Sequence, residues 1–179
     1  MALLSYTELL NLVEQGVMTP CKAEDVNSSS IDVHLGRWLI VESCAHGHPV
    51  DIAKRESFAS TKVDLMKGPA ILGPGEFALG QTFETFNLPL DVSAEFRLKS
   101  SGARSGLNNL FACHCDAGWN GSVLTLELHN VLRHHALILT YGMPIGQMLF
   151  HRHTPVPLDM SYNKRGRYNG DKTVSGVKP

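Results

Sequence analysis

Short apolar stretches, broken by Gly, Pro and Asn, dominate the chain from Ile31 onward. In several of these stretches apolar and polar residues alternate, which is typical of β-strands with one buried face. The pattern predicts strands within residues 31–41, 76–83, 94–98, 122–129, 136–141 and 145–150. The expected fold is therefore mostly β, built as a sandwich, a jelly roll or a barrel.

One short helix is expected before the strands. Ser5 and Glu8 have the spacing of a capping box, in which two side chains satisfy backbone amides at a helix start. The apolar residues at 9, 10, 12 and 13 then share one helix face. Gly16 follows them and is expected to end the helix.

The length and charge of the chain limit what it can be. Its 179 residues can bury one hydrophobic core, and we expect a single domain over residues 1–179. The formal net charge of −1 argues against a protein that binds DNA or RNA over a broad face. A small anionic ligand needs only a local basic cluster.

No segment resembles a targeting or membrane signal. MALLSYTELL is too short and too polar for a signal peptide, and no apolar run approaches the length of a membrane span. We therefore expect a cytoplasmic protein that does not contact membranes. Residues 161–179 are polar and basic without apolar periodicity, so this tail is expected to be mobile.

The segment KSSGARSGL, residues 99–107, combines two basic side chains, three hydroxyls and two glycines. An ordinary surface turn accounts for such a composition, since Ser and Gly are common in turns. A binding segment for an anion is the alternative, because basic and hydroxyl groups donate hydrogen bonds to oxygens.

Glu127 places a carboxylate in the apolar strand segment TLEL. The alternation points it away from the neighbouring leucines, onto the face that it shares with Thr125. A carboxylate there either faces solvent or is retained for a function, because burying it unpaired costs several kcal/mol. Arg104 is its natural partner if it is functional.

The cysteines do not suggest a metal site. They are Cys21, Cys44, Cys113 and Cys115. The last two are too close in sequence for an ordinary structural disulfide, so reduced thiols are expected. The C-H-C triplet at 113–115 lacks the spacing of zinc ligands, and residues 44–48 (CAHGH) form only a loop candidate.

Several segments taken together resemble the dCTP deaminase branch of the trimeric dUTPase superfamily. In chain order they are SIDVHLG, GPGEFALGQTFETFNLPLD, KSSGARSGL, DAGWNG, TLELHN, GMPIGQMLF and YNKRGRYNGD. The resemblance implies a dUTPase-like distorted β-barrel or jelly roll with a short N-terminal helix. It also implies a homotrimer with active sites shared between subunits, and a mobile lid formed by residues 161–179.

The resemblance also assigns nucleotide-binding residues. In the KSSGAR segment they are Lys99, Ser100, Ser101, Gly102, Ala103 and Arg104. Elsewhere they are Asp116, Thr125, Leu126, Glu127, Tyr162, Arg167 and Asp171. Lys and hydroxyl groups suit phosphate oxygens, and Gly lets the backbone come close.

Glu127 matches the family's catalytic carboxylate for hydrolytic deamination at C4 of cytosine. It is expected to take a proton from water and pass it to N3 or to the departing amine. Ser100 and the main-chain carbonyl of Ala112 would hold that water, and Arg104 would keep Glu127 ionised. The H-x-E or C-x-E and P-C-x-x-C pattern of zinc deaminases is absent, so no zinc is expected. Mg²⁺ is expected only as the ion that the triphosphate carries.

Three positions depart from the family pattern. Lys99 stands where Arg is usual, Arg167 where Lys is usual, and Asp171 where Gln is usual. An acidic group beside a triphosphate is unfavourable unless a cation bridges them or the tail moves away. The DAGW segment is also one residue nearer to KSSGAR and one residue farther from Glu127 than usual, so a compensating bulge is expected.

The favoured interpretation is deamination of dCTP to dUTP and ammonia, which supplies dUTP and dUMP for thymidylate synthesis. Asp116 also matches the aspartate that activates water for attack on the α-phosphate in dUTPases. A bifunctional enzyme that yields dUMP and pyrophosphate is therefore the main alternative. A plain dUTPase and a non-catalytic nucleotide-binding trimer are the others, and dTTP is a candidate inhibitor.

Overall fold

The computed structural model describes residues 2–43, 47, 49–110, 112 and 114–178 of the chain. Its strands are β1 (Ala2–Leu3), β2 (Met18–Thr19), β3 (Ile31–His34), β4 (Trp38–Glu42), β5 (Ser60–Asp64), β6 (Ala70–Leu72), β7 (Phe77–Asn87), β8 (Val92–Leu98), β9 (Leu107–Asn109), β10 (His114–Cys115), β11 (Asn120–Asn130), β12 (Leu137–Leu139) and β13 (Pro144–Arg152). Its helices are α1 (Tyr6–Glu14), α2 (Ser100–Arg104) and α3 (Tyr162–Arg165), with 3₁₀ turns η1 (Ala23–Asp25), η2 (Leu65–Lys67) and η3 (Leu158–Met160). Each predicted strand region overlaps an observed strand.

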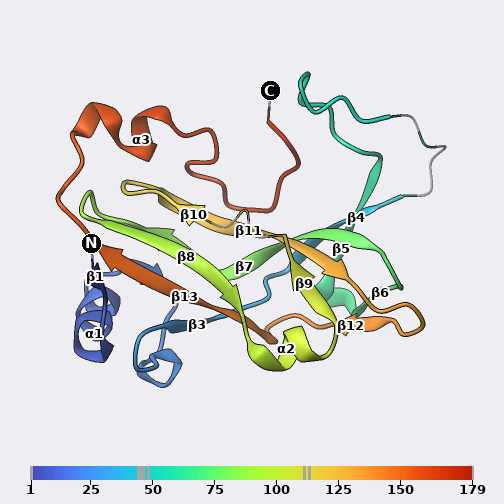
Figure 1. Ribbon diagram of the computed structural model, residues 1–179, viewed down its shortest axis with the longest axis horizontal. Coiled ribbons are helices and arrows are strands. Elements are labelled where there is room, and N and C mark those ends of the chain that lie inside the picture. The colour runs from blue at the N-terminus through green and yellow to red at the C-terminus, as the bar shows by residue number, and fades with distance from the viewer. Residues whose placement is uncertain (1, 44–46, 48, 111, 113, 179) are drawn as a thin grey trace.

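Two antiparallel sheets form the body of the molecule (Figure 1). The strand order of the first is β1-β13-β8-β10, and β3 also pairs with β13. The order of the second is β5-β4-β7-β11-β9, and β2 also pairs with β7. Strands β6 and β12 pair with each other. The mostly β fold predicted from the alternation is confirmed.

Both sheets and α1 contribute side chains to one hydrophobic core. Leu9 and Leu12 of α1 are buried in it, as the helix periodicity predicts. The predicted capping box is confirmed, because the backbone N–H and the hydroxyl of Ser5 both donate to Glu8 Oε2, at 2.9 and 2.8 Å. Gly16 follows the helix with a φ of +73°.

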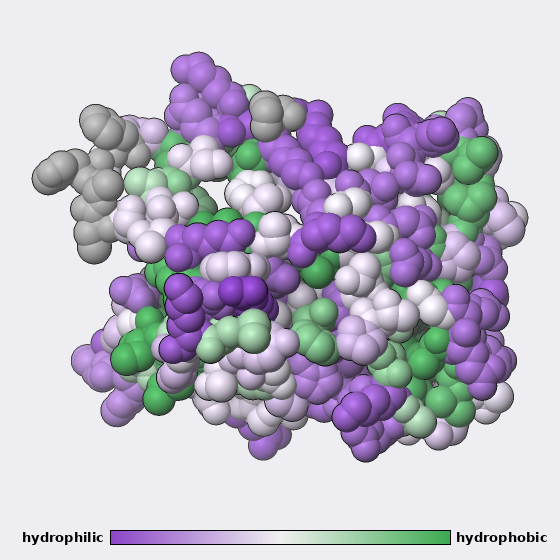
Figure 2. All heavy atoms as spheres, turned by 180° about the vertical axis from the view of Figure 1, so that it is seen from behind, coloured by the Kyte–Doolittle hydropathy of each residue, from purple (hydrophilic) through white to green (hydrophobic). Residues whose placement is uncertain are grey.

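The surface agrees with the sequence composition. Figure 2 shows that hydrophilic residues cover much of the rear face, with hydrophobic residues in scattered patches. Within the described part of the chain, no helix has the length and apolar character needed to cross a membrane.

The ladder between β7 and β11 contains a bulge. Asn120 and Ser122 pair with adjacent residues of β7, so Gly121 is an extra residue in β11. Gly121 has a φ of +64°, which glycine adopts at little cost and which is typical of such bulges. The extra residue lies between the DAGW segment and Glu127, and its role in compensating for the motif spacing stays a prediction.

A second irregularity in the same ladder loops out residues 82–84 of β7 opposite Leu124. The Leu124 N–H donates to Thr82 Oγ1 at 2.9 Å, so a side-chain hydroxyl replaces the usual carbonyl partner. The Thr82 hydroxyl in turn donates to the Glu84 carbonyl oxygen at 2.8 Å. The loop directs the Glu84 side chain inward, where only 3% of it is exposed.

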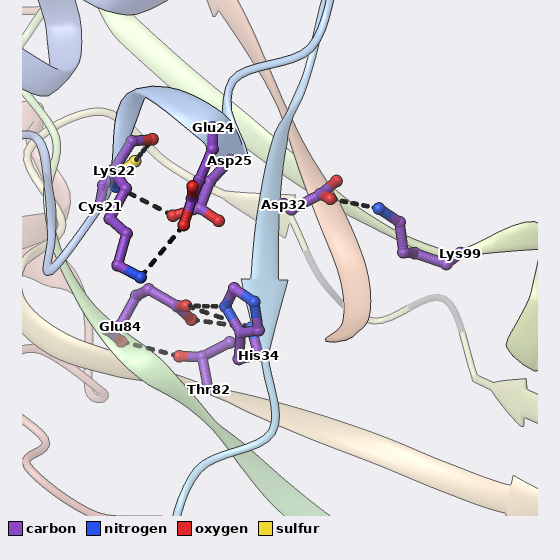
Figure 3. A network of polar contacts seen from close by, with 9 residues as sticks. All are labelled: Cys21, Lys22, Glu24, Asp25, Asp32, His34, Thr82, Glu84 and Lys99. Atoms are coloured by element: carbon purple, nitrogen blue, oxygen red, sulfur yellow. Dashed lines mark hydrogen bonds and ion pairs between the residues drawn. The ribbon is translucent and has the colours of Figure 1, made fainter. Parts of the chain in front are cut away.

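The buried carboxylate of Glu84 meets His34 of β3 (Figure 3). The backbone N–H of His34 donates to both carboxylate oxygens, and the ring Nδ1 lies 2.8 Å from Oε1. Burial nevertheless raises the pKa of Glu84 above its ordinary value of 4.5, against the lowering effect of the hydrogen bonds from His34. The pair ties β3 to the irregular part of β7.

The raised pKa of Glu84 predicts a pH-dependent stability difference. A folded-state pKa above the unfolded value gives a contribution that is present at low pH and is lost as pH rises through the folded pKa. The variant Glu84→Gln does not titrate, so it should gain stability relative to the wild type between pH 4.5 and neutrality. Urea unfolding across this range measures the difference. The variant Glu42→Gln, which removes an exposed carboxylate at the end of β4, is the control. A stability difference between Glu84→Gln and the wild type that does not change with pH would contradict the prediction.

Candidate active site

A cavity of about 450 Å³ lies between the β7–β11 ladder and the C-terminal tail. Its walls come from the loop before β5, from strands β7 and β11, from the segment 112–119 and from residues 162–177. Six of the sequence-predicted site residues line it: Ala112, Asp116, Thr125, Glu127, Tyr162 and Asp171. The structure therefore brings together residues that span 60 positions of the sequence.

Strand β11 presents Glu127 and Thr125 to the cavity. Both are partly exposed, whereas Leu126 and Leu128 between and beside them are fully buried. The predicted alternation is thus confirmed, and Glu127 faces a hollow rather than an open surface. The Leu126 side chain, which the resemblance assigns to nucleotide binding, lies in the core.

Asp116 stands at the start of a turn that borders the cavity. The Trp119 N–H donates to the Asp116 carbonyl at 3.2 Å, which closes the turn. The His114 Nε2 lies 3.4 Å from Asp116 Oδ1. Asp116 and Glu127 thus present two carboxylates to one cavity from different segments.

The C-terminal tail covers the cavity as an extended strap. Figure 1 shows it passing over the sheet after α3. The Val123 N–H of β11 donates to the Asp171 carbonyl at 2.8 Å, and the Gly170 N–H donates to the Asn120 carbonyl at 3.1 Å. Apolar contact adds to these bonds, because Val174 is only 3% exposed. The assignment of residues 161–179 as a mobile lid stays a prediction.

Side chains of the body, Gln81 and Trp119 among them, fix the tail directly. The Val174 N–H donates to Oε1 of Gln81, a buried residue of β7, at 2.9 Å. The Trp119 Nε1 donates to the Tyr168 carbonyl at 2.9 Å. Burial raises the pKa of the Tyr162 phenol, whose hydroxyl accepts a bond from the Tyr168 N–H at 3.4 Å.

The KSSGAR residues form a second group, apart from the cavity. They fold into helix α2 instead of a turn, because the Ala103 N–H reaches the Lys99 carbonyl and the Ser105 N–H reaches that of Ser101, both at 3.1 Å. No residue from 99 to 104 is among the described residues that line the cavity. The expected pairing of Arg104 with Glu127 stays a prediction.

Lys99 immediately precedes α2 and forms an ion pair with Asp32 of β3 (Figure 3). Asp32 also accepts a bond from Asn27 Nδ2 at 2.8 Å. The Lys99 side chain remains 31% exposed, so it can still meet a ligand. Arg167, the remaining predicted residue, is not among the described lining residues, and its carbonyl accepts a bond from Lys178 Nζ at 3.1 Å.

The sequence prediction missed an aromatic wall of the cavity. Phe58 and Phe77 meet edge to face there, with ring centroids 5.7 Å apart. Trp119 and Tyr168 also line it. The last two lie within the quoted motifs DAGWNG and YNKRGRYNGD, which offered a signal, but Phe58 lies in a loop without any motif.

Among residues 2–43, 47, 49–110, 112 and 114–178, no group of three or more His, Cys, Asp or Glu side chains is placed to hold a metal ion. Cys44, His46, His48 and Cys113 lie outside the described residues. The expectation of catalysis without zinc stays a prediction.

Comparisons with known proteins identify the family of this chain. Residues 3–153 match the dCTP deaminase-like family model. A "dCTP deaminase, dUMP-forming" of Mycobacterium ulcerans is 36% identical over 152 residues, which cover 82% of this chain and 78% of the relative. Another of that name, from Corynebacterium kroppenstedtii, is 32% identical over 182 residues, 98% of this chain and 96% of the relative.

A solved structure supports the fold. The crystal structure of 2'-deoxycytidine 5'-triphosphate deaminase from Agrobacterium tumefaciens superposes with a TM-score of 0.66 at 22% identity. The match covers 84% of this chain and 48% of the solved one, so the chain spans about half the length of that protein. The family model and the curated relatives together show that the chain belongs to the dCTP deaminase-like family.

Proposed function

We propose that the protein is a bifunctional enzyme that converts dCTP and two water molecules into dUMP, ammonia and pyrophosphate. The observation that carries the proposal is the placement of Glu127 and Asp116 on one cavity, since each reaction needs its own carboxylate. The curated relatives named dUMP-forming support this alternative over the dUTP-forming interpretation favoured by the sequence.

In the first step, Glu127 removes a proton from water as the oxygen adds to C4 of cytosine. The same carboxyl then donates that proton to the departing amine, and ammonia leaves. The second hydrogen of the water ends on N3, so that the ring becomes uracil. The Ala112 carbonyl, which borders the cavity, is suited to accept the second hydrogen of the attacking water. The apolar and aromatic walls limit bulk water around the base.

In the second step, Asp116 removes a proton from another water, whose oxygen attacks the α-phosphorus. The bond from the α-phosphorus to the bridging oxygen breaks, and pyrophosphate leaves with that oxygen. Asp116 is 62% exposed, which gives it access to such a water. Mg²⁺ would be held by phosphate oxygens of the nucleotide, where it would neutralise charge on the leaving pyrophosphate.

The cavity of one chain lacks the positive charge that a triphosphate needs. Its charged lining residues are Asp116, Glu127 and Asp171, and neither Lys nor Arg occurs among its described lining residues. Lys99 and Arg104 lie apart from it on α2. The proposal therefore includes a homotrimer, in which residues 99–104 of a neighbouring copy supply Lys99 to the phosphates and place Ser100 and Arg104 beside Glu127.

The test is to incubate the protein with dCTP and Mg²⁺ and to measure ammonia and pyrophosphate separately. Equal amounts of both are expected. Ammonia without pyrophosphate would mean a deaminase that forms dUTP. Binding of dCTP with neither product would mean a non-catalytic nucleotide-binding protein.

The tail is proposed to close over the bound nucleotide, and a point change can test this. In Val174→Asp a buried apolar contact becomes a buried charge, which should release the strap from Gln81. The KM for dCTP is expected to rise about tenfold or more. Thr173→Asp adds the same charge at the adjacent, partly exposed position, where Lys62 Nζ already donates to the Thr173 hydroxyl at 3.1 Å and can pair with the carboxylate, so it should change KM little. Equal KM values in both variants would remove the lid from the proposal.

A further inference from the structure

We propose that Lys178 is a positioning residue of the nucleotide site, the counter-ion that lets Asp171 lie beside a triphosphate. This inference rests on the proposed function. Asp171 lines the cavity and forms an ion pair with Lys178 Nζ. Ser175 Oγ also donates to the Asp171 carboxylate, at 3.3 Å.

Lys178 is held at this place by more than its charge. Its Nζ donates to the Arg167 carbonyl at 3.1 Å and lies 5.3 Å from the centre of the Tyr168 ring, a cation–π contact. Its backbone N–H donates to the Tyr168 hydroxyl at 3.4 Å. The end of the tail thus folds back so that one ammonium group meets Asp171.

Asp171 lines the cavity at a distance from Glu127. Its carbonyl is bonded to Val123, which is four residues from Glu127 on β11. At roughly 3.3 Å per residue, Asp171 and Glu127 are about 13 Å apart along the strand. This separation leaves room for a nucleotide whose C4 faces Glu127 to place its phosphates beside Asp171.

A carboxylate at that place repels phosphate unless it is neutralised. The Asp171 side chain is only 17% exposed, so solvent screens its charge weakly. Lys178 is 32% exposed and has three donors, so it can keep Asp171 and still face an anion. The ion pair with Lys178 thereby offsets the repulsion that Asp171 would otherwise exert on a triphosphate.

The test is a double-mutant cycle read as kcat and KM for dCTP. Lys178→Met should raise KM about tenfold with little change in kcat, because Asp171 is left as an uncompensated charge beside the phosphates. Asp171→Asn should bind at least as tightly as the wild type. The double variant should return to a KM near the wild-type value, and Lys178→Arg should keep it.

A purely structural tie between the two residues predicts a different result. Either single change would then loosen the tail equally, and the double variant would not recover, which would overturn the inference. An unchanged KM in Lys178→Met would also overturn it. Lys172→Met removes the same charge at the exposed residue next to Asp171 and is the matched control, expected to stay near the wild type. A wild-type protein that neither binds nor converts dCTP would instead overturn the proposed function.

Discussion

Glu127→Gln is expected to lower the rate of ammonia release from dCTP by about a thousandfold or more. Glutamine keeps the size and the hydrogen-bonding oxygen of the side chain, but it cannot take a proton from water or return one to the amine. Binding of dCTP should persist, because the cavity and the strap are unchanged. Ammonia release and the dCTP dissociation constant are the two measurements.

The control for this change is Glu95→Gln on β8, a carboxylate that is not among the described residues of the cavity lining and that pairs with Arg97 at 2.7 Å. Its ammonia release should match the wild type. Retained turnover in Glu127→Gln would show that another group carries the proton. Loss of dCTP binding together with turnover would show that Glu127 holds the substrate rather than activating water.

Asp116→Asn is expected to separate the two products. Pyrophosphate release should fall about a hundredfold or more, because the amide cannot activate the water that attacks the α-phosphorus. Ammonia release should continue, since Glu127 remains in place on β11. Nucleotide analysis should then find dUTP accumulating where the wild type yields dUMP.

The matched control is Asp159→Asn, an exposed aspartate of η3 that is not among the described lining residues. Both products should form there at wild-type rates. A parallel fall of ammonia and pyrophosphate in Asp116→Asn would assign Asp116 to substrate binding. Unchanged pyrophosphate would assign the second reaction to another group.

The sequence predicted the secondary structure correctly where the local pattern of apolar and polar residues determines it. The strand with Glu127 shows period-two alternation, and the helix after Ser5 has both a cap and an apolar face. Short strands such as β9 and β10 carry too few residues to show a period. Helix α2 was not predicted, because its Ser and Gly content is typical of a turn. The backbone N–H groups of residues 103 and 105 instead form helical hydrogen bonds.

The sequence predicted residues of the site but not their arrangement in space. The motifs named Asp116 and Glu127, which the structure places on one cavity. They also named Lys99 and Arg104, which are not among the described lining residues of this cavity. Strand pairing, and not the order of the motifs, determines which residues lie close together. Phe58 could not be predicted as a site residue, since its loop contacts β7 only in the folded chain.

The irregular stretch of β7 has a consequence for how the sequence can vary. Residues 81–84 bind the strap through Gln81, bridge to β11 through Thr82 and hold β3 through Glu84. An insertion or deletion there would displace three segments at once, including the strand that carries the proposed proton-transfer group. Length variation among descendants of this gene should therefore spare the middle of β7.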